Sequence, residues 1–137
     1  MKEINLGVKP AKYDDGEKLS DVMTYNHYGT ETIPPRPVLR IAAEKVLASA
    51  EFKQKMKAFL KNVAAYTMSG QPGLIEEIEY KLLVYIGQQA IAEAKRIIDG
   101  GTELQPNAPR TIAKKGFDKP LYETGLMIKN MEYEVTE

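Results

Sequence analysis

The chain contains few of the residues on which redox chemistry and transition-metal binding depend. Its 137 residues include no cysteine and a single histidine, His27. The missing cysteines exclude disulfides, thiolate metal ligands and cysteine nucleophiles. One histidine excludes a metal site built from several histidines of one subunit, although carboxylates remain available to hard cations. We therefore predict neither a cofactor nor a metal site.

Net charge and long apolar runs are also missing. The 19 Lys and Arg residues balance 19 Asp and Glu residues, so no overall field attracts nucleic acid or an anionic membrane. No apolar run approaches the roughly 20 residues of a membrane span, and the N-terminal segment lacks the apolar core of a signal peptide. We expect one domain over residues 1–137, made in the cytoplasm and without a membrane partner.

Alternating side chains at both ends of the chain predict strands. Residues 2–8 and residues 131–136 each place apolar side chains on one face and polar side chains on the other. Two such strands need partners, and each matches the other. The expected fold is therefore α+β, with a small antiparallel sheet that includes both terminal strands and packs against two to three long helices.

Apolar side chains recur every three or four residues between the strands, which predicts helices. The longest such stretch, residues 74–99, would span about 39 Å, more than the core of a small domain needs. Residues 38–68 predict either one helix or two with a bend near Ser49. A shorter helix over residues 21–28 is expected to be capped by Ser20.

Two segments interrupt this pattern and hold six of the eight prolines. They are NHYGTETIPPRPVLR at residues 26–40 and PNAPRTIAKKGFDKPLYETG at residues 106–125. Proline fixes φ and removes an N–H donor, so these segments suit arms of fixed shape better than helices or central strands. The second belongs to an extended arm over about residues 100–123, followed by a short helix expected over residues 122–129.

Such an arm favours a docking function. A loop of more than about 20 residues is uncommon in a small domain unless it has a role, and rigid segments lose less entropy on docking. We predict that both segments contact other copies of the chain or neighbouring proteins. The side chains expected at these contacts are Thr32, Ile33, Pro34, Pro35, Arg36, Pro37, Arg40, Pro106, Asn107, Pro109, Arg110, Thr111, Ile112, Lys115, Lys119, Pro120 and Leu121.

Nucleic-acid binding is the first alternative. The second segment is basic, through Arg110, Lys114, Lys115 and Lys119, and basic side chains contact phosphates. However, the segment contains no glycine-rich phosphate loop and only one aromatic residue well placed among the cations, Phe117. Solvated lysines on a loop explain the same pattern.

Catalysis is the weaker alternative. His27 lies near Asp21 and Glu31, and a histidine suits proton transfer at neutral pH. No nucleophile-bearing turn accompanies it, and packing of a helix-end His27 on Tyr28 is the favoured explanation. A cluster of glutamates begins the long helix, where the helix dipole favours acids without any metal. These glutamates are Glu76, Glu77 and Glu79. We therefore predict no catalytic residues and no enzyme activity.

Both proline-rich segments resemble one known family. The first resembles the pattern Asn-Glu-Phe-Gly-Thr, a few residues, and then Ile-Pro-Ala-Arg-Pro-Phe-Leu-Arg. The second resembles Pro-Asn-Ala-Pro-Ser-Thr-Ile-Ala-Arg-Lys-Gly-Ser-Asp-Lys-Pro-Leu-Ile-Asp-Thr-Gly-Gln-Leu, followed by a strand. These patterns belong to the neck and tail-completion proteins of tailed bacteriophages and prophages. The resemblance covers nearly the whole chain. It departs from the patterns at His27, Tyr28, Val38, Tyr122, Glu123, Met127 and Ile128.

The resemblance implies a structural virion protein that is made in the host cytoplasm and incorporated into the neck or tail of the particle. It implies a homo-oligomeric ring, six-fold or twelve-fold, between the portal and adaptor proteins and the tail tube. The expected partners are neighbouring neck, adaptor, tail-tube or sheath proteins. DNA would pass through the ring without specific binding. Tail terminator, head-completion ring and collar all remain open as the position.

Overall fold

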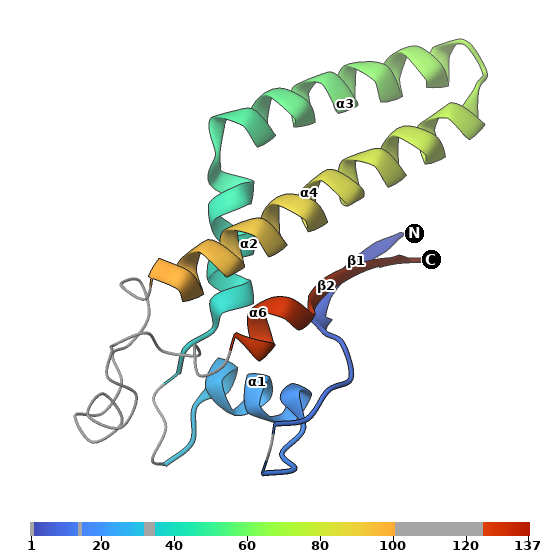
Figure 1. Ribbon diagram of the computed structural model, residues 1–137. Coiled ribbons are helices and arrows are strands. Elements are labelled where there is room, and N and C mark those ends of the chain that lie inside the picture. Colours follow the sequence, from blue (N-terminus) through green and yellow to red (C-terminus); the bar gives the residue numbers. More distant parts are fainter. Residues whose placement is uncertain (1, 14, 32–34, 101–124) are drawn as a thin grey trace.

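A computed structural model describes residues 2–13, 15–31, 35–100 and 125–137 of the chain (Figure 1). Predictions that concern the other residues lie outside this part. Several helices pack with a two-stranded sheet, so the predicted α+β class is confirmed. The elements in chain order are β1 (Glu3–Val8), α1 (Leu19–Tyr28), α2 (Val38–Ala48), α3 (Ala50–Met68), α4 (Pro72–Gly100), α6 (Leu126–Asn130) and β2 (Met131–Thr136).

The sheet joins the two ends of the chain. Strands β1 and β2 pair antiparallel, with Ile4 opposite Val135 and Leu6 opposite Tyr133. Because side chains alternate along a strand, these apolar residues share one face and the polar residues share the other. The pairing of the terminal strands, predicted from their alternation, is confirmed.

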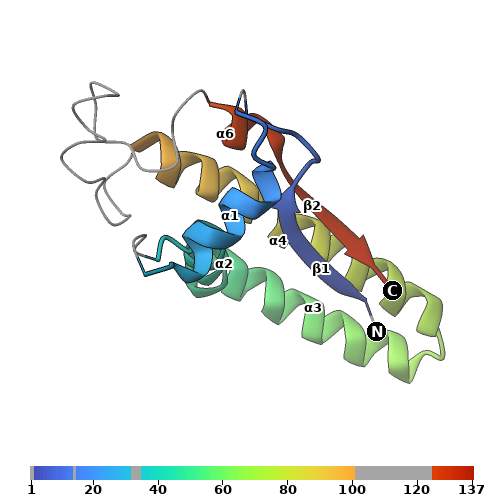
Figure 2. The same cartoon turned by 90° about the horizontal axis from the view of Figure 1, so that it is seen from below.

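Helix α4 is the central element of the molecule. Helix α2 crosses it, helix α3 runs alongside it, and the sheet packs against another side (Figure 1 and Figure 2). The main core forms around the C-terminal half of α4, where α1, α2 and α6 also meet it. The buried core residues are Leu19, Met23, Val38, Leu39, Ala42, Ile91, Ala94, Ile97, Ile98, Met127 and Met131.

The N-terminal half of α4 has a different environment. Together with α3 it forms a helical hairpin that extends away from the core (Figure 1). Within α3, which the structure describes in full, Phe52 is the one buried residue. Along α4 the buried residues begin only at Gly87. The apolar stripe of α3 therefore meets mainly α4.

Gly87 allows the sheet to approach α4 closely. A Cβ atom at this position would lie 2.6 Å from the ring of Tyr133 and 2.7 Å from Cδ1 of Ile4. Real Cβ atoms do not approach other atoms so closely, because the optimal separation of two non-bonded carbon atoms is about 3.5–4.0 Å. The missing side chain at Gly87 is thus a condition for the observed seating of both strands.

Substituting Gly87 by alanine is expected to destabilise the fold. Overpacking costs about 1–3 kcal/mol, whereas alanine gains about 1 kcal/mol in helix propensity over glycine, so the loss prevails by roughly 1 kcal/mol. Gly73→Ala is the matched control, since a Cβ at Gly73 meets nothing within 4 Å. Chemical denaturation of both variants measures the difference. Equal stability of the two would contradict the close contact.

Residues 38–68 form two helices rather than one, which resolves the alternative left open by periodicity. Ser49 adopts an extended conformation between them, with φ −70° and ψ 150°. Its hydroxyl donates to the carbonyl of Val46 at 2.7 Å and accepts from the N–H of Phe52 at 3.2 Å. One side chain thus caps the end of α2 and the start of α3.

Three expected helix boundaries were wrong. Helix α1 begins at Leu19, and its N-cap residue Lys18 makes no side-chain capping bond, so Ser20 is not a cap. Helix α4 begins at Pro72, because a proline fits a first helical position, where no helical acceptor exists for the N–H. It also continues through Gly100, one residue beyond the stretch predicted from periodicity. The last short helix, expected over residues 122–129, is described as α6 only from Leu126, and its earlier part lies outside the described residues.

The capping role of Ser49 leads to a second prediction. Ser49→Ala removes both hydrogen bonds and should lower the free energy of unfolding by about 1 kcal/mol, the usual value of an N-cap. Ser20→Ala should change it by less than about 0.5 kcal/mol, since Ser20 is exposed and its hydroxyl is no cap. Thermal unfolding of both variants is the measurement. A Ser49→Ala protein as stable as Ser20→Ala would mean that packing alone separates α2 from α3.

Candidate functional site

Two residues of the first proline-rich segment, Asn26 and Arg36, bind each other. The backbone N–H of Arg36 donates to the carbonyl of Asn26, and Nη1 of Arg36 donates to Oδ1 of Asn26 at 3.3 Å. Nδ2 of Asn26 in turn donates to the carbonyl of Val22 at 2.9 Å. Both Asn26 and Arg36 are only 8% exposed. The asparagine that opens this segment and the arginine of its proline cluster therefore hold the chain between α1 and α2.

The exposed part of this segment is smaller than the sequence indicated. Arg36 and Pro37 are buried, so their side chains support the fold in this subunit. Pro35 and Arg40 are exposed, and Arg40 approaches Glu44 at 3.9 Å. An exposed ion pair of this kind contributes little, about 0–1 kcal/mol, and leaves the guanidinium accessible. Thr32, Ile33 and Pro34 lie outside the described residues.

The two arginines should respond differently to truncation. Arg36→Ala removes a charged donor from a buried amide and should lower the free energy of unfolding by about 1.5–3 kcal/mol. Arg40→Ala is the control from the same segment and should cost less than about 0.5 kcal/mol. Urea denaturation of the two purified variants gives both values. If Arg36→Ala proved as mild as Arg40→Ala, the tie to Asn26 would not be structural.

The second proline-rich segment lies outside the described residues. Its predicted contact residues therefore stay predictions, as does the nucleic-acid alternative that depends on its cations. These residues are Pro106, Asn107, Pro109, Arg110, Thr111, Ile112, Lys114, Lys115, Phe117, Lys119, Pro120 and Leu121.

His27 packs on its neighbour. Its ring meets that of Tyr28 edge to face, with ring centroids 4.6 Å apart. Within the part of the chain that the structure describes, His27 forms no hydrogen bond or ion pair with Asp21 or Glu31. The surroundings of His27 thus favour aromatic packing over an acid–base pair.

The glutamates of α4 are separated rather than convergent. Because α4 begins at Pro72, Glu76, Glu77 and Glu79 lie beyond its first turn, and the expected helix-dipole explanation was wrong in that respect. Glu77 pairs with Lys81 at 3.0 Å, and Glu79 accepts from the backbone N–H of Lys2 at 3.3 Å. Over residues 2–13, 15–31, 35–100 and 125–137, no three His, Asp or Glu side chains gather as metal ligands would.

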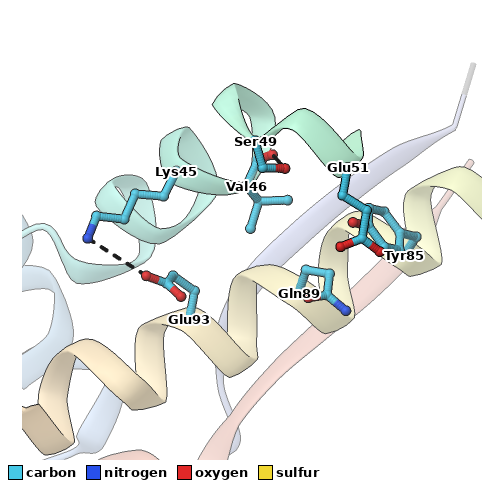
Figure 3. Close-up of a pocket in the computed structure, with 7 residues that line it drawn as sticks. All are labelled: Lys45, Val46, Ser49, Glu51, Tyr85, Gln89 and Glu93. Atoms are coloured by element: carbon cyan, nitrogen blue, oxygen red, sulfur yellow. Dashed lines mark hydrogen bonds and ion pairs between the residues drawn. The ribbon is translucent and has the colours of Figure 1, made fainter. Parts of the chain in front are cut away.

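A polar hollow of about 240 Å³ lies where α2, α3 and α4 meet (Figure 3). Lys45 reaches across it to Glu93 at 3.7 Å. Glu51 lies beside Tyr85, and the pKa of the tyrosine is raised, first by partial desolvation and then by this carboxylate. Nζ of Lys55 lies 4.7 Å from the centre of the Tyr85 ring. These side chains interact with one another, and their contacts connect the three helices.

The helical hairpin carries apolar side chains that solvent reaches. The exposed fraction is 58% for Leu60, 89% for Met68 and 50% for Tyr80, and Leu74 is also exposed. Periodicity places Leu60 in an apolar stripe directed at the core, so its exposure was not predicted. The length of the predicted helix was the available signal, since residues 74–99 exceed what a small core can cover. Exposed apolar groups of this kind often mark an interaction surface.

Comparison with known proteins gave no match: no protein-family model, no curated protein and no solved structure matches the chain. Nor does any helix in the described part have the length and apolar character needed to cross a bilayer.

Proposed function

We propose that the chain is a structural virion protein of a tailed bacteriophage or prophage. It assembles as a ring in the neck or tail-completion region, where it joins head to tail around the DNA channel. The observation that carries this proposal is the resemblance of both proline-rich segments, in order, to the segments of that family. The hydrogen bond between Asn26 and Arg36 supports the proposal. It explains in physical terms why an asparagine and an arginine stand ten residues apart in the first segment.

The shape of the molecule also supports an assembling role. The hairpin of α3 and α4 extends from the core and exposes Leu60, Met68 and Tyr80. A monomer gains nothing from such exposure, whereas a neighbouring subunit that covers these side chains removes apolar surface from water. The ring expected from the family is six-fold or twelve-fold, with neck, adaptor, tail-tube or sheath proteins as further neighbours.

A nucleic-acid-binding module is the second candidate. Helix α3 favours it in one respect, since it carries Lys53, Lys55, Lys57 and Lys61 against Glu51. Binding that depends on such phosphate contacts weakens steeply with salt. A ring through which DNA only passes should instead bind duplex weakly at physiological salt, with no preference for sequence.

Particle completion tests the proposal directly. In a phage or prophage whose own copy is deleted, the wild-type chain should restore attachment of tails to heads. Replacement of residues 106–119 by a glycine–serine linker of equal length should abolish it, because the predicted docking arm is lost while chain connectivity is kept. Electron microscopy and infectious titre are the measurements. Full infectivity of particles carrying the linker variant would contradict a docking role for the arm, and full infectivity without the chain would contradict the function.

A further inference from the structure

One flank of α3 carries a row of lysines, here called the basic ridge: Lys53, Lys57 and Lys61. They are spaced by four residues, so they lie along one flank at intervals of about 6 Å. All three are exposed, in contrast to the half-buried Phe59 and Val63 that form part of the stripe towards α4. None of the three has an ion-pair partner within the described residues.

The outer face of the sheet carries a matching row of carboxylates, here called the acidic face: Glu3, Glu132 and Glu134. Because Ile4 and Tyr133 face α4, the alternate positions of both strands face away from it. Glu3 pairs with Thr136, one two-residue step beyond Glu134, so the three carboxylates follow one another along the sheet. All three are exposed and, in the part of the chain that is described, unpaired.

The two rows have nearly the same repeat. Residues on one face of a strand recur about every 6.8 Å, against about 6 Å for the lysines, so three successive pairs stay within reach of one another. We propose that a second copy of this chain docks its basic ridge on the acidic face. The inference rests on the proposed function, because it names the contact between neighbouring subunits of the ring.

The surface around the acidic face allows a helix to come close. Gly7 lies opposite Glu132 on the outer face, and a Cβ there would meet nothing within 4 Å. A glycine in a strand often marks a place where another backbone approaches. Beside the basic ridge, the exposed side chains of Leu60 and Met68 add apolar area to the contact.

The positions of the two surfaces determine the symmetry of the contact. The α3 helix and the sheet lie on different sides of α4 (Figure 1 and Figure 2). Each copy therefore donates one surface and receives another, which is a heterologous contact, and such contacts generate rings when the rotation closes. A two-fold contact through the ridge alone would bring lysine against lysine.

Charge reversal on each surface tests the proposal. The variants K53E/K57E/K61E and E3K/E132K/E134K should each weaken self-association at least about tenfold at low salt, because attraction becomes repulsion at three exposed pairs. An equimolar mixture of the two should recover it, since the acidic α3 of one fits the basic sheet of the other. A mixed ring alternates and closes only with an even number of subunits, which six-fold and twelve-fold rings allow.

Two further proteins serve as controls. The chain that carries all six substitutions, and so has both surfaces reversed, should assemble by itself as the wild type does. The variant K12E/K18E/K129E changes the net charge by the same amount as K53E/K57E/K61E. It does so at exposed positions away from the ridge, and it should assemble normally. Mass photometry gives the oligomeric state of each, and circular dichroism verifies folding.

Disulfide trapping supplies a measurement that does not depend on charge-reversed chains folding. The chain has no cysteine, so the double variant K57C/E134C introduces the only two thiols. Under mild oxidation it should give a ladder of covalent oligomers on a non-reducing gel. Each single cysteine variant should stop at the dimer.

The outcomes separate this inference from the proposed function. Triple variants that assemble as the wild type does would overturn the pairing, as would a wild-type chain that stays monomeric or a mixture that fails to recover. Loss of duplex binding without loss of assembly in K53E/K57E/K61E would assign the ridge to nucleic acid instead. Particle completion is scored independently: rings without completed particles would contradict the function and leave the pairing standing.

Discussion

The close contact between α4 and the terminal sheet is the constraint on which the rest of the structure depends. A two-stranded sheet is marginally stable in water, so it needs a helix to cover its apolar face. Gly87 provides the place, because Tyr133 and Ile4 lie directly on the helix backbone there. Since the two strands are the two ends of the chain, this single contact fixes both termini near the middle of α4.

Burial differs between the two halves of α4. Around Ala94 and Ile97 the helix is covered from several sides and belongs to the core. Towards Tyr80 it has fewer neighbours, and the stripe that faces α3 is only partly buried. Because most of the stability of a helix comes from packing of its apolar face, this less covered part of α4 is expected to be less stable than the C-terminal half. The chain therefore contains a packed body and a projecting hairpin, and the proposed assembly would cover the apolar surface of that hairpin.

Spacing along the chain was enough to predict the class of the fold, the order of its elements and the pairing of its ends, because periods of 2 and 3.6 are local properties. Burial was not predictable in the same way. Leu60 lies in an apolar stripe of α3 that has the periodicity of a core helix, yet its side chain is exposed. Arginine is usually a surface residue, yet Arg36 is buried and donates a hydrogen bond to the side chain of Asn26. Both outcomes depend on residues distant in sequence, which periodicity does not report.

The distribution of charge argues for directional assembly. Helix α3, which carries the lysines, and the sheet, which carries the glutamates, lie on different sides of α4. Two copies related by a two-fold axis through either surface would therefore repel. Exposed ion pairs contribute little free energy each, and their main effect is to select which surfaces meet and in which register. In the proposed contact, apolar side chains such as Leu60 and Met68 would contribute the burial. Zero net charge is compatible with the proposed head-to-tail order of subunits, because the basic ridge and the acidic face balance each other as separate surfaces.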